Sequence, residues 1–245
     1  MRLAGKTAIV TGGGSGFGAG IARKFAAEGA HVFVVDINGD AASIIADEVG
    51  GTAVTCDVSN AASVNALAKT VLSNGPLNIL VNNAGVTHLP SAMEDVTEAD
   101  FDRVFNVNMK SVFLLARAFV PHFKERKTGV ILNVASTAGV SPRPRLNWYN
   151  ASKGWMITAT KTMAVELAPD GIRVNAINPV AGDTPLLKTF MGEDTPEMRA
   201  NFLSTIPIGR FSTPEDMGNA ACFLCSDEAS MITGVAVEVD GGRCI

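Results

Sequence analysis

The sequence has little of what several classes of protein require. No apolar run approaches the roughly 20 residues that a membrane-spanning helix needs. The 20 basic and 24 acidic residues are scattered along the chain, the formal net charge is −4, and no basic block points to nucleic acid. Residues 1–6 lead at once into a strand-like run, without the charged start and long apolar stretch of a signal peptide. We therefore expect a cytoplasmic protein that binds neither membrane nor nucleic acid.

Cysteine and histidine are also scarce, which argues against a metal centre. Two of the four cysteines, Cys222 and Cys225, form a C-x-x-C pair, but no second pair completes a zinc site. The pair lies in an apolar stretch that predicts a buried helix face, where free cysteine behaves as a small hydrophobic residue. His88 and His122 have no partner at metal-ligand spacing. We expect core packing for the cysteines, structural roles for both histidines, and no bound metal.

What the sequence does contain is a regular alternation of apolar runs with amphipathic ones, and 47% of its residues are hydrophobic. Strands are predicted over residues 6–11, 30–36, 52–56, 77–82, 129–135, 172–178 and 235–239. Helices are predicted over residues 18–28, 41–49, 61–72, 97–124 and 150–167. Thr213 followed by Pro214 marks the start of one more helix.

The strand candidates are continuously apolar, as in His31-Val-Phe-Val-Val-Asp36, rather than alternating. This is typical of strands that are covered on both faces in a parallel sheet. Strands that alternate with helices form right-handed βαβ units. The prediction is one α/β domain over residues 1–245: a single doubly wound parallel sheet, the Rossmann fold, flanked by helices on both faces.

Residues 179–207 break this pattern. The segment is rich in Pro, Gly, Thr and Met, and it is too long for an ordinary connection within a compact domain. Phe190, Met191, Met198 and Phe202 give it an apolar side. We predict a substrate lid around residues 183–207.

A glycine-rich turn, Thr11-Gly-Gly-Gly-Ser-Gly-Phe-Gly18, follows the first predicted strand and opens a helix. Glycine permits a tight turn and close approach of backbone N–H groups to a pyrophosphate, which rests at the helix N-terminus. The second strand ends at Asp36, whose carboxylate can accept hydrogen bonds from both adenosine ribose hydroxyls. The same charge would repel a 2′-phosphate, by about 4 kcal/mol at roughly 4 Å and an effective dielectric constant of about 20. With no Lys or Arg in the loop or just after Asp36, the sequence predicts NAD as the cofactor.

A second group of residues predicts acid/base chemistry. Tyr149, the only tyrosine, and Lys153 are four residues apart near the start of a predicted helix, and so lie on one face. A nearby ammonium group favours the phenolate and lowers the phenol pKa, which lets Tyr149 act as general acid or base near neutral pH. Ser136 closes a strand at the sheet edge where α/β proteins bind ligands, and its hydroxyl can hydrogen-bond a substrate oxygen. Asn108 lies mid-helix, where Asn is mildly unfavourable, which suggests a helix irregularity holding a water.

In this order and spacing, these motifs resemble those of the short-chain dehydrogenase/reductase family over essentially the whole chain. Further matches are Asp57 after the third strand, Asn82-Asn-Ala-Gly85 after the fourth, and Asp240-Gly-Gly242 near the C-terminus. The resemblance implies that Tyr149 is the acid/base and that Ser136 orients the substrate. It also implies that Lys153 holds the nicotinamide ribose and lowers the tyrosine pKa, and that Asn108 fixes a water in a proton relay.

The resemblance further implies a homotetramer and a set of cofactor contacts. Asp57 is expected at the adenine, Asn83 to Gly85 in the cofactor cleft, and Thr184 at the carboxamide. The cofactor-binding residues implied are Gly12, Ser15, Gly16, Phe17, Gly18, Asp36, Ile37, Asp57, Val58, Asn83, Ala84, Gly85, Tyr149, Lys153, Pro179 and Thr184.

One position departs from the family pattern. Pro-Gly is common after the sixth strand, whereas here Pro179 is followed by Val180, and a glycine comes two positions later at Gly182. We therefore expect the turn beside the nicotinamide to differ, while Thr184 keeps its offset from Pro179.

The sequence leaves the small-molecule substrate open. The expected reaction is an NAD-dependent interconversion of a secondary alcohol and a ketone, on a sugar, a polyol or another small alcohol, with a 3-oxoacyl thioester as the alternative. Arg143 and Arg145 either bind an anionic substrate or face solvent or a subunit interface. The resemblance also implies that Trp148 and residues 86–89 form part of the pocket wall. A remote alternative is an idle NAD(H)-binding protein, but such a relative would be expected to have lost Ser136, Tyr149 or Lys153.

Overall fold

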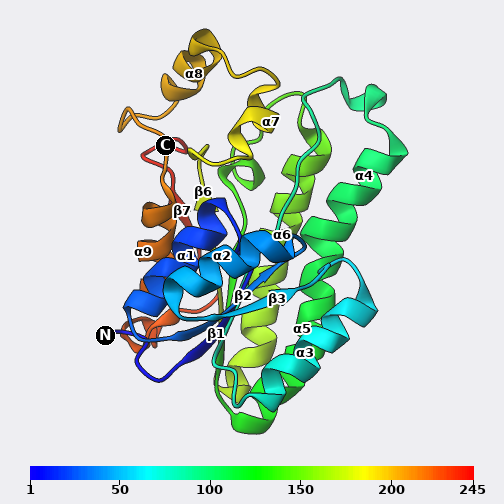
Figure 1. Ribbon diagram of the computed structural model, residues 1–245. Coiled ribbons are helices and arrows are strands. Elements are labelled where there is room, and N and C mark those ends of the chain that lie inside the picture. The colour runs from blue at the N-terminus through cyan, green and yellow to red at the C-terminus, as the bar shows by residue number, and fades with distance from the viewer.

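The computed structural model describes residues 1–245 and places seven parallel strands in one sheet (Figure 1). The order across the sheet is β3-β2-β1-β4-β5-β6-β7. All seven predicted strands are present, with ends within two residues of the predicted ones, and the predicted fold class is confirmed. The strands are β1 (Thr7–Thr11), β2 (His31–Asp36), β3 (Thr52–Thr55), β4 (Ile79–Asn82), β5 (Gly129–Val134), β6 (Ile172–Pro179) and β7 (Ala236–Val239).

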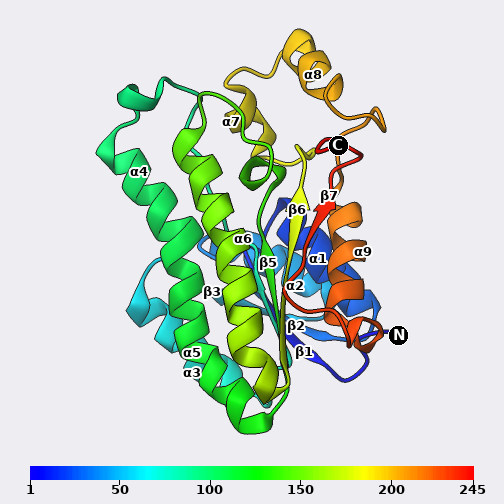
Figure 2. The ribbon, with the colours of Figure 1, turned by 180° about the vertical axis from the view of Figure 1, so that it is seen from behind.

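Helices cover both faces of this sheet, in two layers (Figures 1 and 2). One layer holds α1 (Gly16–Ala27), α2 (Gly39–Val49) and α9 (Pro214–Cys225); the other holds α3 (Ala61–Ser73), α5 (Ser111–Arg126) and α6 (Asn147–Leu167). Each layer forms its own buried apolar cluster with the sheet, the first around Phe25 and the second around Phe119 and Phe123. Two buried faces explain why the central strands are mostly apolar rather than alternating between apolar and polar residues.

The cysteines of the C-x-x-C pair pack in this core, as predicted. Cys222 and Cys225 lie on the buried face of α9, and both thiols are free. The Thr213 start signal is also confirmed, because the Thr213 and Asp216 side chains form a reciprocal capping box at the N-terminus of α9. None of the helices combines the length and the apolar character that crossing a membrane would take.

The long helix predicted over residues 97–124 is interrupted. It consists of α4 (Glu98–Phe105), a π-helical turn (Asn106–Lys110) and then α5. Asn108 is the fully buried residue of that turn. The expected helix irregularity at Asn108 is therefore present, and π-turns are frequent at functional sites.

The predicted lid contains two short helices that the sequence did not indicate. They are α7 (Leu187–Met191) and α8 (Pro196–Leu203), and they lie beyond the carboxyl ends of the strands (Figures 1 and 2). The strand order reverses between β1 and β4 at that same edge. In open α/β sheets this reversal leaves a crevice in which ligands bind.

Candidate active site

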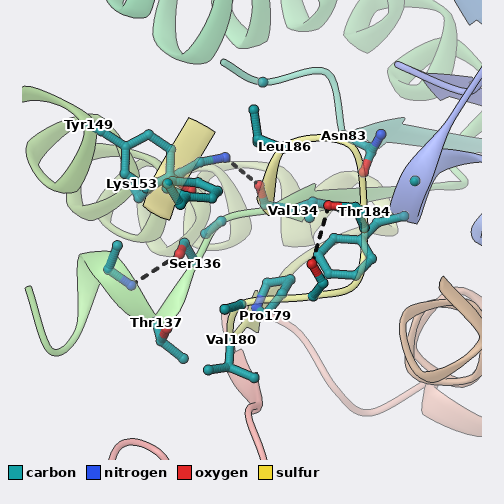
Figure 3. Close-up of a pocket in the computed structure, with 18 of the residues that line it drawn as sticks. Asn83, Val134, Ser136, Thr137, Tyr149, Lys153, Pro179, Val180, Thr184 and Leu186 are labelled. Atoms are coloured by element: carbon teal, nitrogen blue, oxygen red, sulfur yellow. Dashed lines mark hydrogen bonds between the residues drawn. The ribbon is translucent and has the colours of Figure 1, made fainter. Parts of the chain in front are cut away.

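A cavity of about 360 Å³ opens at the carboxyl ends of β1, β4, β5 and β6. It is continuous from the glycine-rich loop, through Ser136, Tyr149 and Lys153, to the lid. Figure 3 shows Tyr149 and Lys153 side by side on α6, with Ser136 below them and the segment from Pro179 to Leu186 across the cavity. The structure therefore brings the predicted catalytic residues and the predicted phosphate loop to one site.

The glycine-rich loop is shaped for an anion. Gly12 and Gly16 have φ of 61° and 51°, which favours glycine. A Cβ on Gly18 would lie 2.0 Å from the Gly12 carbonyl oxygen, so α1 docks onto the loop only with glycine there. The Ser15 side chain makes no capping bond, and the N–H groups of residues 16–18 have no acceptor within the protein. These free donors at a helix N-terminus fit the pyrophosphate of a dinucleotide.

Asn83 holds the glycine-rich loop in place through hydrogen bonds. Its side-chain amide donates to the carbonyl oxygens of Thr11 and Gly12, at 2.8 and 3.1 Å, and its backbone N–H donates to Thr11 Oγ1 at 3.0 Å. Ala84 N–H donates to the same hydroxyl. The segment after β4 thus ties the end of β1 in place, while Ala84 and Gly85 line the cavity.

Asp36 lies at the end of β2 with both carboxylate oxygens oriented by backbone donors. Gly14 N–H donates to Oδ2 and Asn38 N–H to Oδ1, each at 3.0 Å. The next residue, Ile37, is 70% exposed, although it is a large apolar side chain. An exposed Ile beside an oriented carboxylate fits an adenosine, whose ribose hydroxyls and flat base need these two kinds of surface.

The other residues predicted at the adenine are less directly placed. The Asp57 Oδ1 atom accepts from the N–H and hydroxyl of Ser59, and Val58 is buried. Asp36 pairs with Thr55 across β2 and β3, so Asp57 and Val58 follow the neighbouring strand end. The lining of the catalytic cavity does not include Asp36, Ile37, Asp57 or Val58.

In the turn after β6, where the sequence departs from the family pattern, the structure shows why residue 182 is glycine. A Cβ on Gly182 would lie 2.2 Å from the Phe17 ring, so glycine is needed where that ring packs. Val180 is buried, and its carbonyl oxygen accepts from the Ser212 hydroxyl. Thr184 still reaches the loop, because a Cβ on Gly16 would contact it at 3.3 Å. Pro179 and Thr184 both line the cavity, as expected of cofactor contacts.

Tyr149 is buried, with Ser136 as its polar neighbour. Burial raises the pKa of the phenol to about 12, and its hydrogen bond with Ser136 opposes that rise. The Ser136 oxygen accepts the Ala138 N–H at 3.1 Å, which leaves the hydroxyl proton free for Tyr149 or a substrate oxygen. The Lys153 ammonium lies 5.8 Å from the tyrosine ring centroid.

The lowering of the Tyr149 pKa by Lys153 stays a prediction, because in the protein alone burial dominates and leaves the pKa raised. Desolvation disfavours the phenolate more than the neighbouring groups stabilise it. Lys153 is also only 4% exposed, and burial lowers its own pKa to about 8. Its ammonium donates to the Val134 carbonyl oxygen at 2.8 Å and has no carboxylate partner.

Asn108 joins three parts of the site. Its amide oxygen accepts the Val86 N–H at 2.9 Å, and its amide nitrogen donates to the Val86 carbonyl oxygen at 2.9 Å and to Ser152 Oγ at 3.0 Å. Ser152 in turn donates to the Tyr149 carbonyl oxygen at 2.7 Å. Both amide N–H groups are thus used to hold the structure together, and the role of Asn108 in a water relay stays a prediction.

The wall facing Tyr149 differs in part from the predicted one. Phe190 of α7 packs against the Tyr149 ring with a centroid distance of 5.0 Å, and Phe202 of α8 lines the far side. Trp148 instead packs edge-on against Phe101, and residues 86–89 line a separate cavity, so neither forms the catalytic wall. Trp148 points away because it and Tyr149 are adjacent on a helix and face different directions.

Comparison with known proteins agrees with this geometry. A family model described as enoyl-(acyl carrier protein) reductase matches residues 12–243. A curated relative, the 4-formylbenzenesulfonate dehydrogenase of Comamonas testosteroni, is 50% identical over 252 residues and covers 100% of both chains. The chain belongs to the short-chain dehydrogenase/reductase family and is an oxidoreductase, which sets aside the idle-protein alternative.

Two solved structures illustrate the fold with ligands. A 3-ketoacyl-(acyl-carrier-protein) reductase from Brucella melitensis, complexed with NADH, has a TM-score of 0.95 and 51% identity, covering 99% of this chain and 100% of that one. A 7α-hydroxysteroid dehydrogenase, complexed with NADH and 7-oxo glycochenodeoxycholic acid, has a TM-score of 0.92 and 40% identity, covering 98% and 95%.

The structure adds residues to the site that the sequence did not single out. Ser152 is buried in the structure. In the sequence it lies between Tyr149 and Lys153, and this position was the one feature that could have indicated its role. Asn150 donates to the Arg143 carbonyl oxygen at 2.7 Å. Arg243 comes from the C-terminal end of the chain and lines a cavity that adjoins the catalytic one. No local pattern pointed to Arg243, because only the fold brings it near residue 143.

Proposed function

We propose that this oxidoreductase is an NAD-dependent dehydrogenase that interconverts a secondary alcohol and a ketone, with Tyr149 as the proton donor and acceptor. The observation that carries the proposal is the single continuous cavity in which Ser136, Tyr149 and Lys153 meet the glycine-rich loop. When bound, NAD supplies the hydride acceptor, and the chain supplies orientation and proton transfer.

The residues around the reacting oxygen have different roles in the proposed reaction. In the reducing direction the Tyr149 hydroxyl gives its proton to the carbonyl oxygen, and Ser136 donates a hydrogen bond to that same oxygen. The buried Lys153 ammonium stabilises negative charge on the tyrosine that results. The raised phenol pKa of the protein alone keeps Tyr149 protonated, as a general acid requires.

NAD rather than NADP is supported by Asp36. Its carboxylate is fixed at the end of β2 by the Gly14 and Asn38 N–H groups and forms no ion pair. A 2′-phosphate at that point would face an oriented negative charge. The two structural neighbours were both solved in complex with NADH, so those two proteins bind the cofactor without a 2′-phosphate.

The substrate is proposed to have an apolar body. Leu146, Leu186, Phe190 and Phe202 surround the space in front of Tyr149. This surface gives less support to a sugar or polyol than to a larger, less hydroxylated carbonyl compound. A 3-oxoacyl thioester is the second candidate, because the NADH-bound neighbour at 51% identity is a 3-ketoacyl reductase.

Assembly and location belong to the same proposal. We propose a homotetramer, supported by large exposed apolar side chains on α4, α5 and α6, among them Phe105, Phe113 and Val165. A cytoplasmic site of action remains a prediction of the sequence.

The proposed function is tested by NADH oxidation with the purified protein. Acetoacetyl thioester, cyclic ketones and keto-sugars are compared, and Tyr149→Phe is measured beside the wild type. We expect roughly 10²- to 10⁴-fold loss of kcat in Tyr149→Phe with NADH binding retained, because only proton transfer is removed. Equal turnover by the two proteins would contradict the role of Tyr149, and a strong preference for the thioester would favour the second candidate.

A further inference from the structure

Two arginines meet beside the catalytic cavity without a carboxylate partner. The Arg143 guanidinium stacks over the Phe202 ring, 4.2 Å from its centroid, and donates to Thr205 Oγ1 at 3.2 Å. Arg243 donates to Ser141 Oγ at 3.3 Å, and its Nε–H is buried with no acceptor. Neither takes part in any ion pair of the structure.

The two positive charges lie in one partly buried recess. Burial lowers the pKa of Arg143, and the positive charge of Arg243 lowers it further, so the two cations act on each other in a partly desolvated place. Asp240 accepts the N–H groups of Gly242 and Cys244, and Glu193 lines only the adjoining cavity. Two unpaired cations in one recess favour an anionic ligand.

Hydrogen bonds fix the backbone at or next to each arginine. Asn150, next to Tyr149, donates to the Arg143 carbonyl oxygen. Asp240 closes a tight turn around Gly241 and Gly242, whose φ values are 62° and 86°, and this turn positions Arg243. Arg145 differs from them: it is exposed and bonds the Pro90 carbonyl oxygen, which fits the solvent-facing alternative.

The position of the pair relates it to the reacting centre. Arg143 lines both the catalytic cavity and the adjoining one, and Leu146, Phe190 and Phe202 are also shared between them. A ligand with its carbonyl at Tyr149 would place an apolar body along these side chains before it reached the guanidinium groups.

We propose that Arg143 and Arg243 form an anion subsite that selects carbonyl substrates with a carboxylate or sulfonate at the far end of an apolar body. The planar guanidinium forks suit either group. The inference deepens the proposed function and rests on it for the placement of the carbonyl. Two proteins similar to this one are associated with carbonyl compounds that combine an acidic group with an apolar body: one is a 4-formylbenzenesulfonate dehydrogenase, and the other forms a complex with 7-oxo glycochenodeoxycholic acid.

The test compares charged and neutral ketones of one shape. NADH-dependent reduction of 4-acetylbenzenesulfonate and 4-acetylbenzoate is measured against that of neutral 4-methylsulfonylacetophenone. The proteins are the wild type, Arg143→Gln, Arg243→Gln and, as a matched control for lost charge, Lys69→Gln on the exposed face of α3. Circular dichroism checks that each variant is folded.

We expect each arginine variant to lose about tenfold or more in kcat/KM for the charged ketones, mainly through KM, because a charge-assisted hydrogen bond is removed. In each arginine variant the loss for the neutral ketone is expected to be several-fold smaller than the loss for the charged ketones, and Lys69→Gln is expected to match the wild type on all three. The relative size of the two losses tells whether sulfonate or carboxylate fits better. Equal losses on charged and neutral ketones, or no wild-type preference for the charged ones, would overturn the subsite.

A binding measurement separates this inference from the proposed function. Calorimetry follows binding of 4-methylbenzenesulfonate, which has no carbonyl to reduce, to the wild type and the same variants in the presence of NADH. A Kd raised about tenfold or more by either arginine substitution supports the subsite even if none of the ketones is turned over. Absent or unaltered binding would refute it even if the neutral ketone is an efficient substrate.

Discussion

Tyr149 illustrates how a single residue depends on its surroundings. Its spacing from Lys153 suggests an activated phenol, yet burial raises the phenol pKa to about 12 and Ser136 only partly offsets this. In the protein without cofactor, Tyr149 is therefore in the neutral, protonated form. The oxidised nicotinamide carries a positive charge, and a positive charge nearby would favour the phenolate.

Because Tyr149 is the only tyrosine, its ionisation can be followed by the ultraviolet absorbance of tyrosinate. In the protein alone we expect no tyrosinate signal below about pH 10 and a midpoint near 12, whereas NAD⁺ should shift the midpoint to lower pH. Since the folded-state pKa lies above the ordinary value of 10, the associated stability is lost as pH rises from 10 through about 12. Tyr149→Phe should abolish the signal, and a midpoint near 10 in the folded protein would contradict the effect of burial.

Asp36 is expected to set the choice between the two dinucleotides. Asp36→Ala removes the carboxylate that Gly14 and Asn38 orient, so the ratio of kcat/KM for NAD⁺ to that for NADP⁺ should fall by roughly tenfold or more. Asp57→Ala, one strand further out, is the control and should affect both cofactors alike. A wild-type preference for NADP⁺ would contradict the assignment.

At the scale of elements, the π-turn between α4 and α5 is the clearest example of local irregularity serving the site. The turn presents Asn108 to the loop after β4, and Asn108 satisfies both backbone polar groups of Val86. A regular helix would place residue 108 at a different angle. The turn thus couples the cofactor-side loop to Ser152 and the backbone of Tyr149.

Asn108→Ala should reveal this coupling in stability as well as in activity. The substitution leaves the Val86 N–H and carbonyl groups without partners, at a cost of about 1–3 kcal/mol for each group that stays buried. Urea denaturation should show that loss, and Asn106→Ala, in the same turn but outside this network, should show much less. An unchanged free energy of unfolding for Asn108→Ala would mean that the network contributes nothing to stability.

At the scale of the whole molecule, the exposed apolar side chains are unevenly placed. Phe113 on α5 is 55% exposed and Val165 on α6 is 80% exposed, both on the helices of one layer. Exposed apolar side chains that lie together on a folded surface mark interaction sites. These exposed side chains support the proposed assembly of the chain into a homotetramer.

Light scattering after size exclusion tests that assembly. The wild type should have about four times the 25.5 kDa mass of one chain, and Phe113→Asp should shift it to a smaller species because a charge would be buried in the interface. Ile44→Asp, on exposed α2 of the opposite layer, is the control and should leave the mass unchanged. A wild-type mass of a single chain would rule out the tetramer.

The sequence by itself determined the parallel sheet and the chemistry at its edge. Continuous apolar strands require cover on both faces, and the motifs at Gly12 to Gly18, Ser136 and Tyr149 to Lys153 are local in the chain. Their residue types and spacing therefore indicate a function even when the tertiary structure is not known. Even the irregularity at Asn108 had a local cause, since Asn is disfavoured within a regular helix.

Only the tertiary structure decided the rest, because those features depend on contacts between distant parts of the chain. The pKa of Tyr149 depends on burial, and burial depends on how α7 closes over α6. The need for glycine at position 182 is explained by the Phe17 ring, which lies far away in the sequence. The meeting of Arg143 with Arg243 likewise requires the C-terminal turn to return to the sheet edge, and no pattern within a single segment could have predicted it.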